Sequence, residues 1–137
     1  MTMHLSLIDR PAGTFRWASA GHDPALIYRA SQKIFEEVDG GGLPLGIDDD
    51  ATYGETEIHG LTVGDVITIG TDGVWEMPNE QADQFGKDRL RAVIQRHAGE
   101  SAATMKERLM ADLNQFRGAA RQVDDVTFAI IKVVATA

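Results

Sequence analysis

An apolar run passes directly into an acidic turn in the segment Val66-Ile67-Thr68-Ile69-Gly70-Thr71-Asp72-Gly73. Val66 to Ile69 has the length and apolar character of a buried strand, and Gly64-Asp65 before it is typical of a turn. Asp72 is therefore predicted to project from the end of a rigid strand, beside a glycine that permits a tight turn and the close approach of a ligand. An Asp-Gly pair after a strand is more often an ordinary turn, so this segment alone does not establish a site.

On the N-terminal side of this segment the chain is rich in strands and turns. Alternating or apolar runs bounded by turn residues predict strands over Met3 to Ile8, Thr14 to Ser19, Ala25 to Tyr28 and Lys33 to Val38. Gly40-Gly41-Gly42 then provides a flexible break, and Asp48-Asp49-Asp50 falls in a predicted loop.

On the C-terminal side the apolar period changes to that of helices. Two stripes with helical spacing predict two amphipathic helices, one carrying Leu90, Val93, Ile94 and His97 and the other carrying Met105, Leu109, Leu113 and Phe116. Ser101 is a suitable cap for the second helix, and Gly118 a suitable stop. Val126 to Val134 is apolar on both faces and predicts a final strand buried between layers.

The order of these elements predicts a single α+β domain over residues 1–137: a largely antiparallel β-sandwich flanked by two helices. The 137 residues leave little room for a second domain, and a hydrophobic content of 43% is sufficient for a packed core. No apolar run is long enough to span a bilayer, and no secretion signal is recognisable. These features are compatible with a cytoplasmic location.

Composition also excludes several classes of site. The absence of cysteine rules out disulfides, thiolate zinc ligands and a cysteine nucleophile. The formal net charge of −8 disfavours binding to nucleic acid or to anionic membranes, although by itself it is also explained by solubility. An acidic protein of this kind suits a site that gathers carboxylates around divalent cations.

A second acidic segment, Val123-Asp124-Asp125-Val126-Thr127, opens the predicted final strand. A solvated strand start explains this pair in isolation, but adjacent acids at the mouth of an apolar strand are costly unless solvated or paired with cations. If the two strands are neighbours, Asp72 and Asp124 converge at one end of the sheet. Oxygen ligands of this type suit Mg²⁺ or Mn²⁺, and with a third carboxylate they could hold two ions about 4 Å apart.

Three further features carry weaker signals. His22 lies in the turn Ala20-Gly21-His22-Asp23-Pro24 and is more often structural in such a position. The loop Gly40 to Gly46 lacks the lysine and hydroxyl residue of a phosphate-binding P-loop. Asp48-Asp49-Asp50 lacks the alternating ligands and terminal glutamate of an EF-hand.

Six segments occur in an order that resembles the PPM (protein phosphatase 2C-like) phosphatases, in the branch of stage II sporulation protein E and the RsbU-type regulators. They are Ala20-Gly21-His22-Asp23-Pro24, Gly42-Leu43-Pro44-Leu45-Gly46, Leu61-Thr62-Val63-Gly64-Asp65, Thr71-Asp72-Gly73-Val74, Phe85-Gly86 and Gln122-Val123-Asp124-Asp125-Val126-Thr127. None is specific alone, but the series is, and it covers nearly the whole chain as the C-terminal half of the family's catalytic domain.

The resemblance implies a serine/threonine phosphatase with a dinuclear Mn²⁺ or Mg²⁺ centre between two sheets. Asp72 and Asp124 match two of the family's metal ligands, and Gly73, Asp125 and His22 are possible supporting residues. The implied reaction is hydrolysis of phosphoserine or phosphothreonine by metal-activated water, on a bacterial signalling protein such as an anti-sigma-factor antagonist.

The resemblance is incomplete, because nothing in the chain matches the family's first metal motif. Either the chain is a fragment of a longer enzyme, or it is a non-catalytic relative that binds a partner. The isolated chain is therefore expected to be inactive or weakly active, and to self-associate or pair with the missing N-terminal half. A haloacid dehalogenase-like phosphatase is the remaining alternative, but Gly70 stands where that class needs its aspartate nucleophile.

Overall fold

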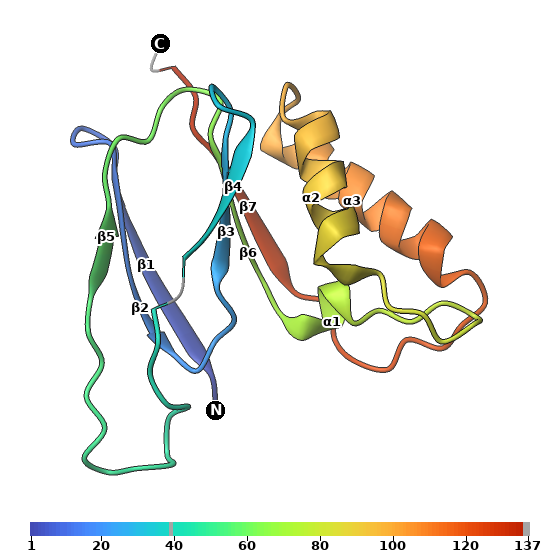
Figure 1. Ribbon diagram of the computed structural model, residues 1–137, viewed down its shortest axis with the longest axis horizontal. Helices are drawn as coiled ribbons and strands as arrows, with labels where there is room; N and C mark the ends of the chain where they lie inside the picture. Colours follow the sequence, from blue (N-terminus) through green and yellow to red (C-terminus); the bar gives the residue numbers. More distant parts are fainter. Residues whose placement is uncertain (39, 136–137) are drawn as a thin grey trace.

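Two antiparallel sheets and a layer of helices are stacked side by side in the computed structural model, which describes residues 1–38 and 40–135 (Figure 1). The strands are β1 (Met3–Asp9), β2 (Thr14–Ala20), β3 (Ala25–Arg29), β4 (Ile34–Val38), β5 (Thr56–Ile58), β6 (Val66–Gly70) and β7 (Phe128–Lys132). The helices are α1 (Asp72–Trp75), α2 (Gly86–His97) and α3 (Ala102–Arg117).

The strands form one sheet of order β1-β2-β5 and another of order β4-β3-β6-β7. All the pairings between these strands are antiparallel. Helices α2 and α3 cover the face of the four-stranded sheet that points away from the other sheet (Figure 1). The predicted α+β sandwich flanked by helices is therefore confirmed.

The central strands β3 and β6 are apolar on both faces because they lie between two cores. Ile27 and Ile67 pack between the sheets with Phe15 and Trp17. The alternate side chains of the same strands pack under the helices, in a cluster that contains Leu26, Tyr28, Val66, Leu90, Val93, Ile94, Met105, Leu109 and Leu113. The continuous apolar run that begins at Val66 is thus a consequence of double burial.

Both long helices begin and end near the residues that the sequence predicts. The Ser101 hydroxyl accepts a hydrogen bond of 3.1 Å from the Thr104 amide, which caps α3. Gly118 follows α3 with a φ of 58°, a conformation that glycine adopts without strain. None of the helices in the described part of the chain is long and apolar enough to cross a membrane.

Three elements differ from the prediction. The single turn of α1 and the short strand β5 were not predicted, since each is too short to show a period. The final strand is shorter than the predicted range 126–134, and it is only partly buried rather than enclosed between layers. The reason is its place in the sheet, since β7 is an edge strand with β6 on one side.

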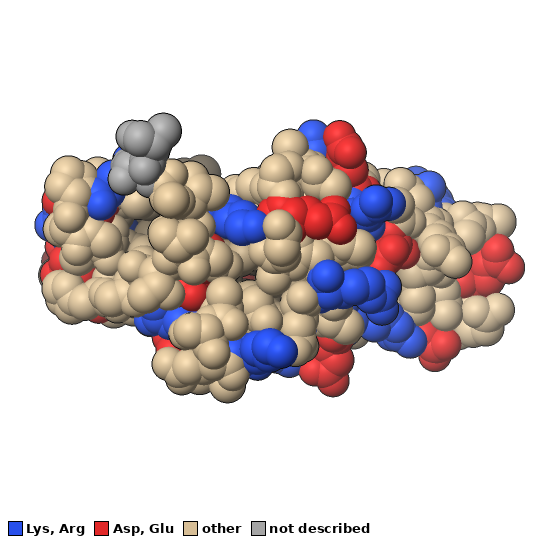
Figure 2. All heavy atoms as spheres, turned by 90° about the horizontal axis from the view of Figure 1, so that it is seen from above, with Lys and Arg blue, Asp and Glu red and all other residues tan. Residues whose placement is uncertain are grey.

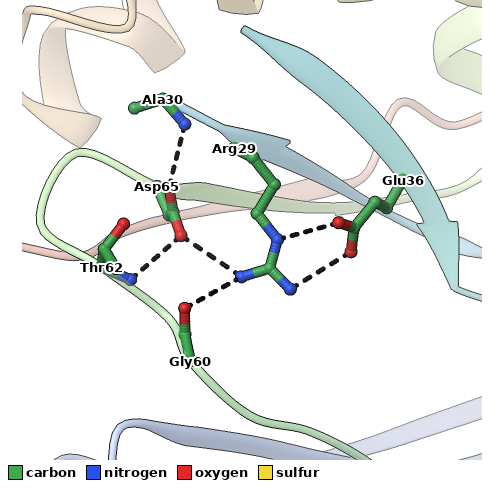
Figure 3. Close-up of polar contacts among 6 residues, drawn as sticks. All are labelled: Arg29, Ala30, Glu36, Gly60, Thr62 and Asp65. Carbon is green, nitrogen blue, oxygen red and sulfur yellow. Dashed lines mark hydrogen bonds and ion pairs between the residues drawn. The ribbon is translucent and has the colours of Figure 1, made fainter. Parts of the chain in front are cut away.

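The turn before β6 holds a buried aspartate, Asp65, with 1% of its surface exposed. Its carboxylate accepts hydrogen bonds from the amides of Ala30 (2.9 Å) and Thr62 (3.0 Å) and from the guanidinium of Arg29 (3.3 Å) (Figure 3). Arg29 also donates two bonds to Glu36, of 3.1 and 3.2 Å. Burial lowers the pKa of Arg29, but Glu36 and Asp65 outweigh that effect and raise it above its ordinary value. This network joins β3, β4 and the turn before β6.

The outer face of β1 remains apolar and uncovered. Met3, Leu5 and Leu7 point to this face and are 44%, 62% and 53% exposed. β1 also lies at the end of its sheet, so in the described part of the chain one edge of its backbone has no neighbouring strand. Exposed apolar stripes beside an open edge are typical of surfaces that associate with another chain or segment.

Charged side chains of both signs are distributed over the surface. Figure 2 shows Lys and Arg side chains interleaved with Asp and Glu side chains toward the helical side of the molecule. The net charge of −8 is therefore not gathered into a single acidic patch in this view.

Candidate functional site

The two acidic segments lie at the same end of the four-stranded sheet. β6 and β7 are antiparallel neighbours in which Gly70, the last residue of β6, pairs with Phe128, the first residue of β7. Pairing continues one step beyond the strands, where the Thr71 amide donates to the Thr127 carbonyl at 3.0 Å. The residues that follow β6 and those that precede β7 therefore lie together at one end of the sheet, as the sequence predicts for neighbouring strands.

Thr71 fastens these two segments together through its side chain. Its hydroxyl lies 3.3 Å from the carbonyl oxygen of Asp125 and 3.4 Å from that of Thr127, and can donate to either. The same oxygen accepts from the Thr127 amide at 3.4 Å. The segment that carries Asp124 and Asp125 is thereby held against the start of α1, where Asp72 lies.

Gly73 is the point of closest contact between the segments. A Cβ at this position would lie 2.2 Å from the carbonyl oxygen of Asp125 and 3.6 Å from Cβ of Asp124. Because the clash involves backbone atoms, a side chain here would push the acidic segment away from α1. The sequence predicted close approach at this glycine, but the partner in the structure is the protein's own backbone.

The carboxylates of Asp72 and Asp124 are exposed. One oxygen of Asp72 accepts from the amide of Gly73 at 2.9 Å, and one oxygen of Asp124 accepts from the amide of Asp125 at 2.7 Å. Within the described residues neither carboxylate has a cationic side chain within ion-pair distance, in contrast to Asp65. Each retains acceptor capacity for a ligand.

The donor chemistry fits a hard divalent cation, but only as part of a coordination shell. Carboxylate oxygens such as those of Asp72 and Asp124 are ligands that Mg²⁺ and Mn²⁺ prefer. Across residues 1–38 and 40–135, however, no group of three or more His, Asp or Glu side chains could hold a metal ion. A hollow of about 360 Å³ beside Asp124 is lined by Gly73, Glu76 and Gln84 among others, which leaves room next to this acid.

His22 lies at this end of the sandwich, in the connection between β2 and β3, and it is engaged with its own turn. Its Nδ1 lies 3.0 Å from the Asp23 carbonyl, and its backbone amide donates to the Ser19 hydroxyl at 3.3 Å. Its ring centroid is 5.5 Å from that of His4. Burial, together with the nearby charge of His22, lowers the pKa of His4. These contacts indicate a structural role for His22 within the turn.

The glycine-rich loop has a packing role where the structure describes it. A Cβ on Gly42 would lie 2.6 Å from the Ser19 carbonyl oxygen, and one on Gly40 would lie 2.6 Å from the Ser19 Cβ. In the acidic loop, Asp48 accepts from the amide of Asp50 at 3.0 Å and forms a local turn. Both observations agree with ordinary loops rather than with a phosphate cradle or a calcium loop.

The sequence did not indicate the role of Thr71 in joining the acidic segments. Its position directly before Asp72 is the only local signal, and its partners are more than 50 residues away. The buried role of Asp65 was also missed, because Gly64-Asp65 was interpreted only as a turn.

Comparisons with known proteins agree with this geometry. The model of the family described as stage II sporulation protein E matches residues 1–134. Phosphoserine phosphatase RsbU of Bacillus subtilis (strain 168) is 30% identical over 132 residues, which is 96% of this chain and 38% of that protein.

Two solved structures show the same fold. The RsbU and RsbW domains of Rv1364c from Mycobacterium tuberculosis match with a TM-score of 0.72 and 27% identity, over 99% of this chain and 37% of that one. The SiaA-PP2C domain of Pseudomonas aeruginosa matches with a TM-score of 0.81 and 23% identity, over 95% of this chain and 50% of that one. The chain thus spans half or less of the length of these relatives.

Proposed function

Because this chain belongs to the stage II sporulation protein E family, we propose that it is the C-terminal part of a metal-dependent phosphatase domain acting on phosphoserine or phosphothreonine in proteins. The observation that carries the proposal is the junction of β6 and β7. There, the Thr71 hydroxyl donates to the Asp125 carbonyl, and the absence of a side chain on Gly73 lets the Asp124-Asp125 segment lie against the start of α1, where Asp72 lies.

Asp72 and Asp124 are the residues that we propose hold Mn²⁺ or Mg²⁺. Such an ion supplies activation of water and neutralisation of phosphoryl charge. The protein's own contribution is positional: the pairing of β6 with β7 and the Thr71 hydrogen bonds hold the two segments together, and Gly73 lets them approach closely. Asp125 contributes to this junction through its backbone. Its carbonyl accepts a hydrogen bond from the Thr71 hydroxyl, and its amide donates one to the Asp124 carboxylate.

The proposed substrate is a phosphorylated bacterial signalling protein, such as an anti-sigma-factor antagonist in the cytoplasm. The support is the relationship to a protein named phosphoserine phosphatase RsbU. Because the chain spans only part of its relatives, we propose that activity requires the N-terminal half of the domain. The exposed stripe of Met3, Leu5 and Leu7 and the open edge of β1 favour association with that half or with a second copy.

Calorimetric titration of the 137-residue chain with Mn²⁺ tests the metal assignment. We expect weak binding with one or two carboxylate-dependent sites, which Asp72→Asn and Asp124→Asn each abolish. Asp48→Asn, in the acidic loop, is the matched control and should leave the titration unchanged. Equal Mn²⁺ binding by wild type and by the double variant Asp72→Asn, Asp124→Asn would rule out the proposed site.

A second candidate function is a non-catalytic relative of the phosphatases that binds a partner protein. It is favoured by the incomplete ligand set, since no third metal-binding side chain joins Asp72 and Asp124 in the described part of the chain. A phosphatase assay with Mn²⁺ and a phosphoserine peptide separates the two once the missing half is added. Restored turnover supports the enzyme, whereas a stable but inactive complex supports the binding module.

A further inference from the structure

A small cavity of about 20 Å³ lies between the four-stranded sheet and the helices, at the end that carries Asp72. Its lining is mostly apolar, and its rim includes Trp75 of α1 and Lys87 of α2. The full lining is Pro24, Leu26, Glu37, Thr68, Gly70, Val74, Trp75, Lys87, Leu90, Leu109 and Phe128. Gly70 and Val74, each two residues from Asp72 in the chain, both line the cavity, which therefore lies near the candidate site.

One polar atom in the wall has no partner. Thr68 is 4% exposed, and in the described part of the chain its hydroxyl oxygen makes no hydrogen bond. A buried hydroxyl without a partner is unfavourable. Apart from Thr68, the polar groups of the lining side chains belong to the rim residues Glu37, Trp75 and Lys87. A ligand that brings its own hydroxyl into the cavity would therefore satisfy the Thr68 hydroxyl.

The rim carries opposite charges beside an aromatic ring. The Lys87 ammonium lies 5.1 Å from the centroid of the Trp75 ring and 3.7 Å from the Glu37 carboxylate. Lys87 and Glu37 are both about one-third exposed, so an extended peptide can reach them. The Lys87 ammonium, which lies over the Trp75 ring, is also suited to bind the negative charge of a phosphorylated peptide segment.

We propose that this cavity receives the small hydroxyl side chain, serine or threonine, next to the phosphorylated residue of the protein substrate. The inference rests on the proposed function and specifies its substrate class. The volume has room for about one water-sized or methyl-sized group, which excludes aromatic neighbours. The unpaired Thr68 hydroxyl selects a hydroxyl over a methyl group, and Lys87 and Trp75 hold the peptide at the rim.

Binding of three peptides to the 137-residue chain tests the proposal. The first is Gly-Thr-phosphoSer-Thr-Gly, and the others carry valine or phenylalanine in place of both threonines. Trp75 fluorescence in a Trp17→Phe background reports binding. If that background does not fold, the indole N–H resonance of Trp75 in the labelled wild type reports the same titration.

We expect the threonine peptide to bind about fivefold more tightly than the valine peptide, the factor that one hydrogen bond supplies. The phenylalanine peptide should bind more weakly still. Thr68→Val keeps the shape of the cavity and should remove the difference between threonine and valine, whereas Thr68→Ile fills it and should weaken both. The control Thr62→Val, at the opposite end of β6, should keep the wild-type order.

The proposal is overturned if threonine and valine peptides bind equally to the wild type, as they would if a water molecule occupied the cavity. It is also overturned if phenylalanine binds as well, if Thr68→Val keeps the preference, or if none of the peptides binds at millimolar concentration. The unphosphorylated threonine peptide separates this inference from the proposed function. A phosphate effect that needs Mn²⁺ and Asp72, without a threonine preference, contradicts only the cavity; a threonine preference with no effect of phosphate or Mn²⁺ contradicts the phosphatase.

Discussion

Two aspartates at opposite ends of β6 have contrasting surroundings. Asp65, just before the strand, is buried, accepts three hydrogen bonds and is paired with Arg29 (Figure 3). Asp72, just after it, is exposed and its carboxylate accepts one hydrogen bond, from its neighbour Gly73. The hydrogen-bonding capacity of Asp65 is used within the protein, whereas the Asp72 carboxylate retains the capacity to accept bonds from a ligand.

The contrast separates an acid that the fold itself uses from one whose carboxylate is left exposed, without reference to sequence motifs. A buried carboxylate must be fully paired, because an uncompensated charge in the interior is unfavourable. An exposed carboxylate on a rigid element has no such need and can be kept for a ligand. Removal of each acid should therefore affect different properties.

The largest effect is expected at the buried end. Asp65→Ala leaves Arg29 partly unpaired and two backbone amides without acceptors, so the free energy of unfolding should fall by about 3–5 kcal/mol. Urea denaturation measures it. Asp9→Ala, which removes one bond to the Ala12 amide in an exposed turn, is the control and should cost about 1 kcal/mol or less. Equal losses for the two variants would contradict the structural role of Asp65.

A smaller loss of stability is expected from a substitution at Gly73, where the two acidic segments are in contact. Gly73→Ala places a Cβ against the Asp125 carbonyl, and the resulting shift should cost about 1–3 kcal/mol and weaken Mn²⁺ binding. Thermal unfolding and calorimetry measure the two effects. Gly99→Ala, at a position with open space around its Cβ, should change neither. A Gly73→Ala variant as stable as wild type would show that the two segments are not in contact in solution.

A pH-dependent loss of stability is expected from His4, which lies on the face of β1 that points toward the other sheet. Burial and His22 lower the pKa of His4 below its ordinary value of 6.5, so the unfolded chain binds more protons than the folded one when the pH falls below that value. Stability should therefore decrease below pH 6.5, by at most about 1.4 kcal/mol per pH unit from this residue. Urea midpoints at several pH values, compared between wild type and His4→Gln, measure this. An identical pH dependence in both proteins would exclude His4 as the cause.

The smallest effect on stability is expected at the exposed end. Asp72→Asn removes a charge that has no cationic partner among the described residues, so the free energy of unfolding should change by no more than about 0.5 kcal/mol. The same variant should lose Mn²⁺ binding, which makes the two ends of β6 opposite in their responses. If Asp72→Asn destabilised the fold as strongly as Asp65→Ala, the contrast between them would disappear.

The sequence predicted the parts of this fold that local patterns determine. The stripes of α2 and α3 and the apolar run of β6 each repeat over several residues, so their elements were found with nearly correct limits. The short elements α1 and β5 have too few residues to show a period. The incomplete burial of β7 depends on its place in the sheet, which no local pattern encodes.

The candidate site was also predicted only in part. Convergence of the segments around Asp72 and Asp124 followed from assuming that two strands are neighbours, and β6 and β7 are neighbours. The clamp by Thr71 and the contact between Gly73 and Asp125 are tertiary contacts across more than 50 residues of chain. The assignment of the two acids as metal ligands remains a prediction.

The network around Asp65 also has a consequence for how the loops behave in time. The amides of Ala30 and Thr62 lie outside the strands, yet both donate to a carboxylate that solvent does not reach. Their hydrogens can exchange with deuterium only when the buried acid itself opens, so they should exchange as slowly as those of the strand core. These loop amides would therefore exchange with deuterium on the same timescale as the amides of the sheet, while the amides around Asp124 would exchange far sooner.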